Sequence, residues 1–200
     1  MTTWCKIGLA IVLLAGVGVA AAMWLLVQHG VSARDEPTAI EAFVARRLRH
    51  LAVPRSARQA QNPVAATPEV LAEARAHFAD HCALCHANDG SGQTEIGKNL
   101  YPKAPDMRES GTQSLSDGEL FYIIHNGVRL TGMPAWGQDP PEEDLESWKL
   151  VHFIRHLPEI SQEELEEMKE LNPRSSHEMK EEEEIENFLQ GGESPGPPHH

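Results

Sequence analysis

Cys82-Ala83-Leu84-Cys85-His86 is the stretch of this 200-residue chain that decides its fold. Two thiols separated by two residues stand directly before an imidazole, and this spacing is the pattern of covalent haem attachment. Each thiol can form a thioether with one vinyl group of the porphyrin, and His86 can then bind the iron as its proximal ligand. The motif therefore predicts one covalent haem c, held by Cys82, Cys85 and His86.

Three other interpretations of the paired cysteines are weaker. A redox-active dithiol would be expected beside a βαβ pattern, and the sequence shows none. A zinc site needs further ligands, and Cys5 is the only other cysteine, next to an apolar segment. A disulfide between Cys82 and Cys85 would leave His86 without a role.

A second axial ligand for the iron is expected in Thr131-Gly132-Met133-Pro134, where Met133 follows His86 by 47 residues. The glycine and proline beside Met133 restrict the backbone, which suits a thioether held toward a metal. His/Met ligation raises the reduction potential of haem iron. His125 is the alternative ligand, and a structural role for Met133 in a small core also stays open.

The order of several motifs resembles the monohaem cytochrome c family over about Thr67–Pro158, a little under half of the chain. After the attachment motif come the Asp89–Gly92 turn, the Leu100–Met107 loop, Asn126-Gly127, Gly132-Met133-Pro134 and a final helix that carries Trp148. The resemblance implies an all-α fold, a small cytochrome c domain built around one covalent haem.

In that family a proline carbonyl accepts the second N–H of the proximal imidazole, which fixes its tautomer. Pro102 and Pro105 are both candidates for this role. Ala87 departs from the glycine that many relatives carry after the histidine, although a small residue still fits there. A domain of about 90 residues buries little surface by itself, so we expect the form without haem to be poorly folded.

Residues 1–30 are predicted to be a single N-terminal transmembrane anchor. Ile7–Val27 is an uncharged, apolar run of 21 residues, long enough to cross a hydrocarbon core of about 30 Å. A cleaved signal peptide is the alternative, because Val31-Ser32-Ala33 is a passable cleavage site. The run, however, exceeds the apolar region of about 7–15 residues that is usual in signal peptides.

The orientation of this anchor is set by two conflicting signals. Lys6 precedes the span, whereas Arg34, Arg46 and Arg47 follow it, so charge alone favours a cytoplasmic C-terminal part. Haem attachment to this motif resembles a process on the outer face of the bacterial cytoplasmic membrane. We therefore expect a single-pass protein with its haem domain on the periplasmic side.

Residues 31–66 are predicted to be an amphipathic segment and a linker. Pro37–Leu51 has helical apolar spacing with interleaved arginines, which suits either an anionic lipid surface or a solvated helix packed lightly on the domain. Val53–Ala66 is rich in proline and small polar residues, so we expect a tether.

Residues 67–158 are predicted to be the cytochrome c domain, with helix ends marked by capping residues. These are Thr67 before the first helix, Ser116 and Glu119 as a capping box, Asn126-Gly127 at the end of that helix, and Asp139-Pro140-Pro141 before the last helix. The expected apolar haem pocket consists of Phe78, Leu100, Ile124 and Trp136.

Residues 159–200 are predicted to be an acidic tail, partly helical or disordered. Ser161 and Glu164 form a second capping box, Glu181–Glu184 is a run of like charges, and Gly191–His200 is rich in glycine and proline. The formal net charge of the chain is −13, which argues against nucleic acid as a partner.

These features predict a membrane-anchored one-electron carrier of a respiratory chain rather than an enzyme. The expected partners are the lipid bilayer and a membrane redox complex, either a quinol-oxidising donor, a terminal oxidase or another reductase. A haem-bearing relay subunit of an oxidoreductase complex is the first alternative. A haem-based gas sensor, in which a gas displaces Met133, is the second.

Overall fold

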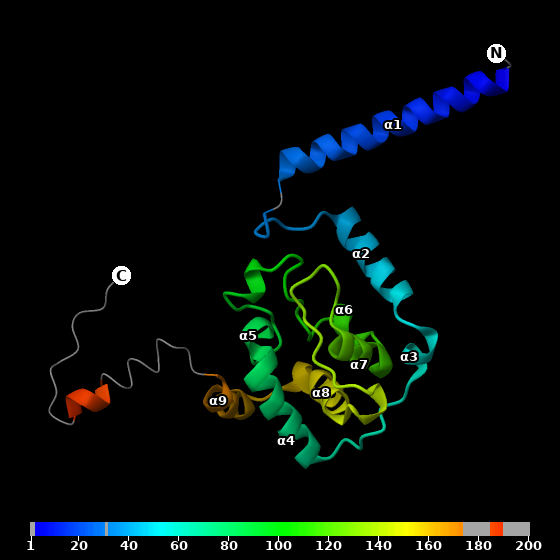
Figure 1. Ribbon diagram of the computed structural model, residues 1–200. Helices are drawn as coiled ribbons and strands as arrows, with labels where there is room; N and C mark the ends of the chain where they lie inside the picture. Colours follow the sequence, from blue (N-terminus) through cyan, green and yellow to red (C-terminus); the bar gives the residue numbers. More distant parts are fainter. Residues whose placement is uncertain (1–2, 31, 174–184, 190–200) are drawn as a thin grey trace. The chain divides into compact units, whose positions relative to one another are not determined.

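A computed structural model describes residues 3–30, 32–173 and 185–189, and these residues form helices and loops without a β-strand (Figure 1). The expected all-α fold is confirmed. The chain divides into two compact units, Met1–Glu36 and Pro37–His200. Both Glu181–Glu184 and Gly191–His200 lie outside the described residues.

The first unit contains one long helix, α1 (Thr3–His29). Its first 23 residues, Thr3–Leu25, are apolar enough for a membrane span. At 1.5 Å per residue they extend about 35 Å, slightly more than a hydrocarbon core of about 30 Å. The helix is therefore compatible with the expected single-pass anchor.

The second unit begins with α2 (Ala39–Ala52), close to the helix expected over Pro37–Leu51. The Thr38 hydroxyl caps it by accepting a hydrogen bond from the Glu41 N–H at 3.2 Å. The large apolar side chains of α2 are exposed: Ile40, Phe43, Val44, Leu48 and Leu51. The helix therefore contacts the rest of the unit with its polar edge and leaves its apolar stripe uncovered.

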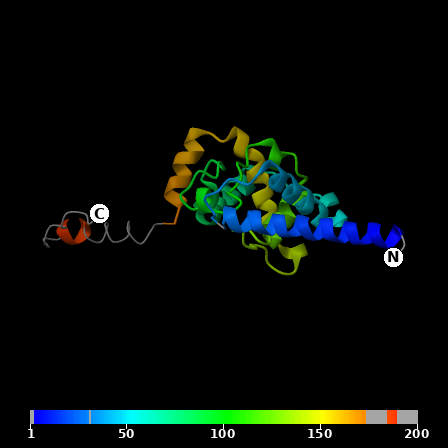
Figure 2. The same cartoon turned by 90° about the horizontal axis from the view of Figure 1, so that it is seen from above.

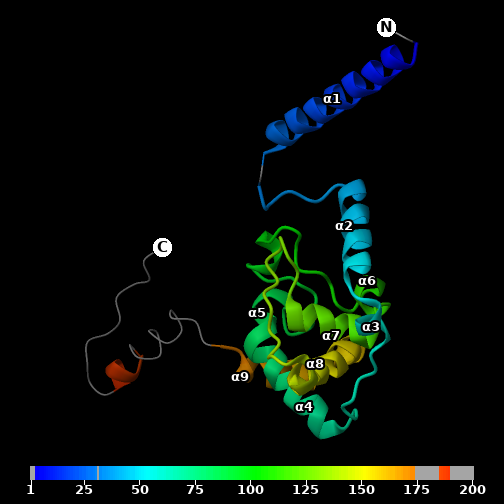
Figure 3. The ribbon, with the colours of Figure 1, turned by 45° about the vertical axis from the view of Figure 1, so that its right-hand side comes forward.

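The segment expected to be a tether, Val53–Ala66, instead packs on the domain, so that prediction is wrong. It contains a short helix, α3 (Arg55–Gln59), which lies against α7 (Asp117–Asn126; Figure 3). Gly118 allows this contact, because a Cβ atom there would lie only 1.8 Å from the Ala57 carbonyl oxygen. Asn62 also donates to the Trp148 carbonyl at 2.9 Å. The small side chains that suggested flexibility permit this close backbone approach.

The helix expected after Thr67 is present as α4 (Pro68–His77), with Pro68 in its first turn. It continues through a π-helical turn (Phe78–Cys82) into α5 (Ala83–His86). Single π turns inside helices occur often at functional sites, because they change the direction in which side chains point. The attachment motif thus occupies the end of one continuous helical stretch.

Helix α7 (Asp117–Asn126) follows the expected pattern, whereas α8 (Leu145–His156) begins later than expected. The capping box of Ser116 and Glu119 is present, and Gly127 follows the last residue of α7. The N-cap of α8 is Asp144, which accepts from the Ser147 N–H at 3.1 Å. Pro141–Glu143 forms only a separate 3₁₀ turn, so Asp139-Pro140-Pro141 does not open this helix.

The core of the domain lies where α4, α7 and α8 meet. Phe78 and Phe153 have ring centroids 5.0 Å apart, and Phe121 stacks on Trp148 at 4.2 Å. Helix α9 (Gln162–Leu171), orange in Figure 2, packs on α4 and the π turn. Met168 of α9 is fully buried, so this part of the expected tail belongs to the folded unit.

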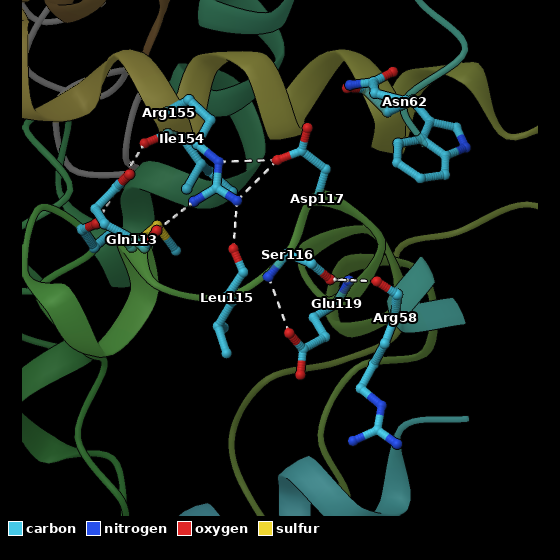
Figure 4. A network of polar contacts seen from close by, with 11 residues as sticks. Arg58, Asn62, Gln113, Leu115, Ser116, Asp117, Glu119, Ile154 and Arg155 are labelled. Atoms are coloured by element: carbon cyan, nitrogen blue, oxygen red, sulfur yellow. Dashed lines mark hydrogen bonds and ion pairs between the residues drawn. The ribbon is translucent and has the colours of Figure 1, made fainter. Parts of the chain in front are cut away.

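A polar network connects α8 with the segment before α7, where the short helix α6 (Ser110–Gln113) lies (Figure 4). Arg155 of α8 donates to Asp117 at 2.8 Å and to the Gln113 carbonyl oxygen at 2.8 Å. Ser116 extends the network to α3, because its hydroxyl donates to the Arg58 carbonyl oxygen at 2.8 Å. These contacts hold the N-terminus of α7 against α8 and α3.

Candidate cofactor site

An apolar cavity of about 180 Å³ lies beside the attachment motif. Cys82, Cys85, His86 and Met133 all line it, although Met133 lies in a distant loop. The four side chains expected to form the haem pocket line it as well: Phe78, Leu100, Ile124 and Trp136. A concave site with mainly apolar walls and a few polar groups is typical of cofactor sites.

The two thiols of the motif are unlinked and carry raised pKa values. Burial, with a smaller contribution from Cys85, raises the pKa of Cys82 to about 12. Burial also raises the pKa of Cys85. A redox-active dithiol needs a lowered thiol pKa, so this environment does not support that interpretation. Among the described residues, no three His, Cys, Asp or Glu side chains form a metal-binding group.

His86 is buried, with 7% of its surface exposed. Burial lowers its pKa to about 4, although the Pro105 carbonyl acts in the opposite direction. Within the described part of the chain, Nδ1 has no partner in full hydrogen-bond geometry. The imidazole is therefore neutral at pH 7 and suited to bind a metal. Of the two candidate prolines, Pro105 is the one whose carbonyl acts on this ring.

Ala87, directly after the motif, has φ of 60° and ψ of 159°. Residues other than glycine rarely adopt this conformation, which costs about 1–3 kcal/mol. The departure from glycine at this position therefore carries a strain that the sequence did not reveal. The turn is nevertheless closed by a 2.8 Å hydrogen bond from the Ala87 N–H to the Ala83 carbonyl oxygen.

The loop that carries Met133 is held in its conformation by hydrogen bonds between its own residues. The Val128 N–H donates to the Met133 carbonyl oxygen at 3.1 Å, and the Met133 N–H donates to the Thr131 hydroxyl at 3.1 Å. Gly127 has φ of 64°, and a Cβ atom there would lie 2.7 Å from the Met133 carbonyl oxygen. A larger residue at 127 would therefore displace this loop.

A second thioether, from Met107, also lines the cavity and is 8% exposed. His125, the alternative ligand, does not line it. Its Nδ1 atom instead lies 2.6 Å from Asp144 at the start of α8, and its ring stacks on Phe121. His125 thus has a structural environment, and the two thioethers that line the cavity are those of Met133 and Met107.

Three polar residues of the cavity were not identified from the sequence. His81 lines the cavity and contacts the Trp136 ring edge-on at 5.5 Å. Arg49 of α2 and Lys103 line it too. No motif marks Arg49, which differs from its neighbouring arginines only by lying opposite the apolar stripe of α2.

The residues present fit a covalent haem. The site offers two unlinked thiols, a buried neutral imidazole beside a carbonyl that can hold its second N–H, and an apolar cavity. These are the groups that attach and ligate a haem c.

The comparison with protein families agrees with this chemistry. Residues 69–154 match the family described as cytochrome C oxidase, cbb3-type, subunit III. No curated protein matches the chain. The match contains the attachment motif, the Met133 loop and most of α8, and it leaves out α1, α2, α3 and α9. Residues 69–154 are therefore a c-type cytochrome domain, which serves haem-based electron transfer.

Proposed function

We propose that this chain is a membrane-anchored electron carrier with one haem c, joined by thioethers to Cys82 and Cys85 and ligated by His86 and Met133. The observation that carries the proposal is the cavity that these four residues share. When bound, the haem supplies a one-electron Fe(III)/Fe(II) couple. With His86 and Met133 in both axial positions, no position is left for substrate or oxygen, so the protein would not be an enzyme.

The apolar walls support this function by excluding water from the iron. Phe78, Ile124 and Leu150 contribute side chains from three different elements, so the cavity is held by the packed core rather than by one loop. A low-polarity environment and a thioether ligand both stabilise the less charged, reduced iron, and we expect a comparatively high reduction potential.

The proposed location is the bacterial cytoplasmic membrane, with α1 as a single-pass anchor and the haem domain on the periplasmic face. The redox partner would be a membrane complex, either a quinol-oxidising donor, a terminal oxidase or another reductase. The acidic character of the chain suits a basic docking surface on that partner, which would mainly increase the encounter rate.

A relay subunit of a terminal oxidase is the second candidate, and the match to a subunit family of cbb3-type cytochrome c oxidase favours it. Extraction in mild detergent distinguishes the two. A relay subunit would copurify with a multi-subunit oxidase in a fixed ratio, whereas a carrier would separate from its partner at moderate salt.

Paired methionine variants test the ligand assignment. We expect Met133→Leu to lower the midpoint potential and to let the reduced protein bind carbon monoxide. Met107→Leu is the matched control, because it changes the other thioether in the cavity with little change in volume. The reverse result, with the effect in Met107→Leu alone, would assign the ligand to Met107. Prompt binding of carbon monoxide by the unmodified protein would favour the gas sensor.

A further inference from the structure

The helix α2 lies outside the matched segment, yet it contributes a charged side chain to the cavity. Arg49 and Lys103 line the cavity, and among the described residues no Asp or Glu does. A cavity that is lined by Arg49 and by no carboxylate of the described residues suits an occupant that brings carboxylates. Haem carries two of them, on its propionate chains, at the edge of an otherwise apolar ring.

Contacts on the polar edge of α2 hold Arg49 in place. His50 Nδ1 lies 3.0 Å from Glu119 of α7, and Arg58 donates to His50 Nε2 at 2.9 Å. Arg58 can only donate, so His50 Nε2 accepts, and the protonated Nδ1 donates a hydrogen bond to the Glu119 carboxylate. The Tyr101 hydroxyl lies 2.5 Å from the Glu41 carboxylate. Both ends of α2 are therefore attached to the domain, and Arg49 lies between them.

The charge of Arg49 is incompletely compensated in this position. Burial lowers its pKa, Glu119 opposes this shift, and Arg46 adds to it. Glu119 is already engaged, since it accepts from the Ser116 N–H at 2.9 Å and from His50. A carboxylate that enters the cavity would supply the missing counter-charge, and a guanidinium can bind it through two parallel hydrogen bonds.

We propose that Arg49 binds a propionate carboxylate of the haem, which makes α2 a wall of the cofactor site. This inference rests on the proposed function, because it requires a haem in the cavity. The bound guanidinium keeps a positive charge near the iron. Since oxidised iron carries one more positive charge than reduced iron, Arg49 favours the reduced state and raises the potential.

Three variants of the full-length, haem-loaded protein test this inference by redox titration. Arg49→Gln removes the charge, Arg49→Lys keeps it, and Arg46→Gln removes a charge one turn away that does not line the cavity. We expect a lower midpoint potential in Arg49→Gln than in Arg46→Gln, and a potential close to the parent in Arg49→Lys. The visible spectra of all three variants should match that of the parent protein, which would show that the iron ligands are unchanged.

Equal potentials in Arg49→Gln and Arg46→Gln, with haem attached and spectra unchanged, would overturn the inference and leave the proposed function intact. Loss of haem from Arg49→Gln alone supports it, because the charge is then required for binding. Loss of haem from all three variants, Arg46→Gln included, overturns it, since the loss then does not depend on the Arg49 side chain. A parent protein without haem would instead refute the proposed function.

Discussion

Helix α5 with the turn before it, and helix α2, both contribute side chains to the same cavity. They differ in what positions those side chains. Cys82, Cys85 and His86 lie within five residues on one helical stretch, so local spacing sets their relation. Arg49 reaches the cavity only because α2 is held by distant partners, such as Glu119, which lies 69 residues from His50 in the chain. A local motif can be identified from the sequence. The part of the cavity that α2 forms cannot, because it depends on long-range contacts.

The largest expected effect is on the local side of this comparison. We expect the double variant Cys82→Ser, Cys85→Ser to lose covalent haem completely, because no thioether can form. Intact mass and Soret absorbance after expression in a host that matures c-type cytochromes measure the loss. Cys5→Ser is the control and should keep both. A double variant that keeps the mass of a covalently attached haem would refute the attachment site.

The polar network that joins α8 to α7 and α3 should give the next largest effect. Arg155→Met leaves Asp117 and the carbonyl oxygens of Gln113 and Leu115 without their donors. We expect a loss of about 2–4 kcal/mol in the free energy of unfolding, measured by denaturant titration. Arg129→Met, at an exposed position, should change it by about 0.5 kcal/mol or less. An equal change in the free energy of unfolding in both variants would mean that the Arg155 network does not stabilise the fold.

Helix α9, which packs on the domain through long-range contacts, should make the stability of the protein depend on pH. Burial acts to raise the pKa of Glu164, but hydrogen bonds from Ser161 and His156 outweigh it and lower the value to about 2, against an ordinary value of 4.5. The stabilisation is therefore complete above pH 4.5 and is lost as the pH falls toward 2. We expect Glu164→Gln to cost about 1–2 kcal/mol at pH 7 and to flatten this part of the profile. The exposed Glu163→Gln should keep the parent's profile.

The smallest effect concerns the backbone strain at Ala87, directly after helix α5. Ala87→Gly relieves the φ of 60°, and we expect the haem-loaded protein to gain about 1 kcal/mol in the free energy of unfolding. Ala83→Gly, four residues earlier in a helical and buried position, should lose about 1 kcal/mol. A loss in both variants would show that the Ala87 conformation is not strained.

Much of the domain was predictable because its signals are local. The capping boxes at Ser116 and Ser161 and the stop at Gly127 are present as expected. The start of α8 was misplaced, because Asp139 and Asp144 are both acceptable caps in sequence and only the fold selects Asp144. The docking of α3 was missed for a similar reason, since small residues serve equally in a tether and in a close helix contact.

By itself, the sequence determined the helical class, the two spaced cysteines with the histidine that follows them and the apolar N-terminal helix, because each depends on residues close together in the chain. Only the tertiary structure decided that Pro105 rather than Pro102 acts on His86, that His125 is turned away from the cavity to Asp144, and that Arg49 enters it. These outcomes depend on which distant segments pack together, and that packing is governed by the summed contacts of the whole domain.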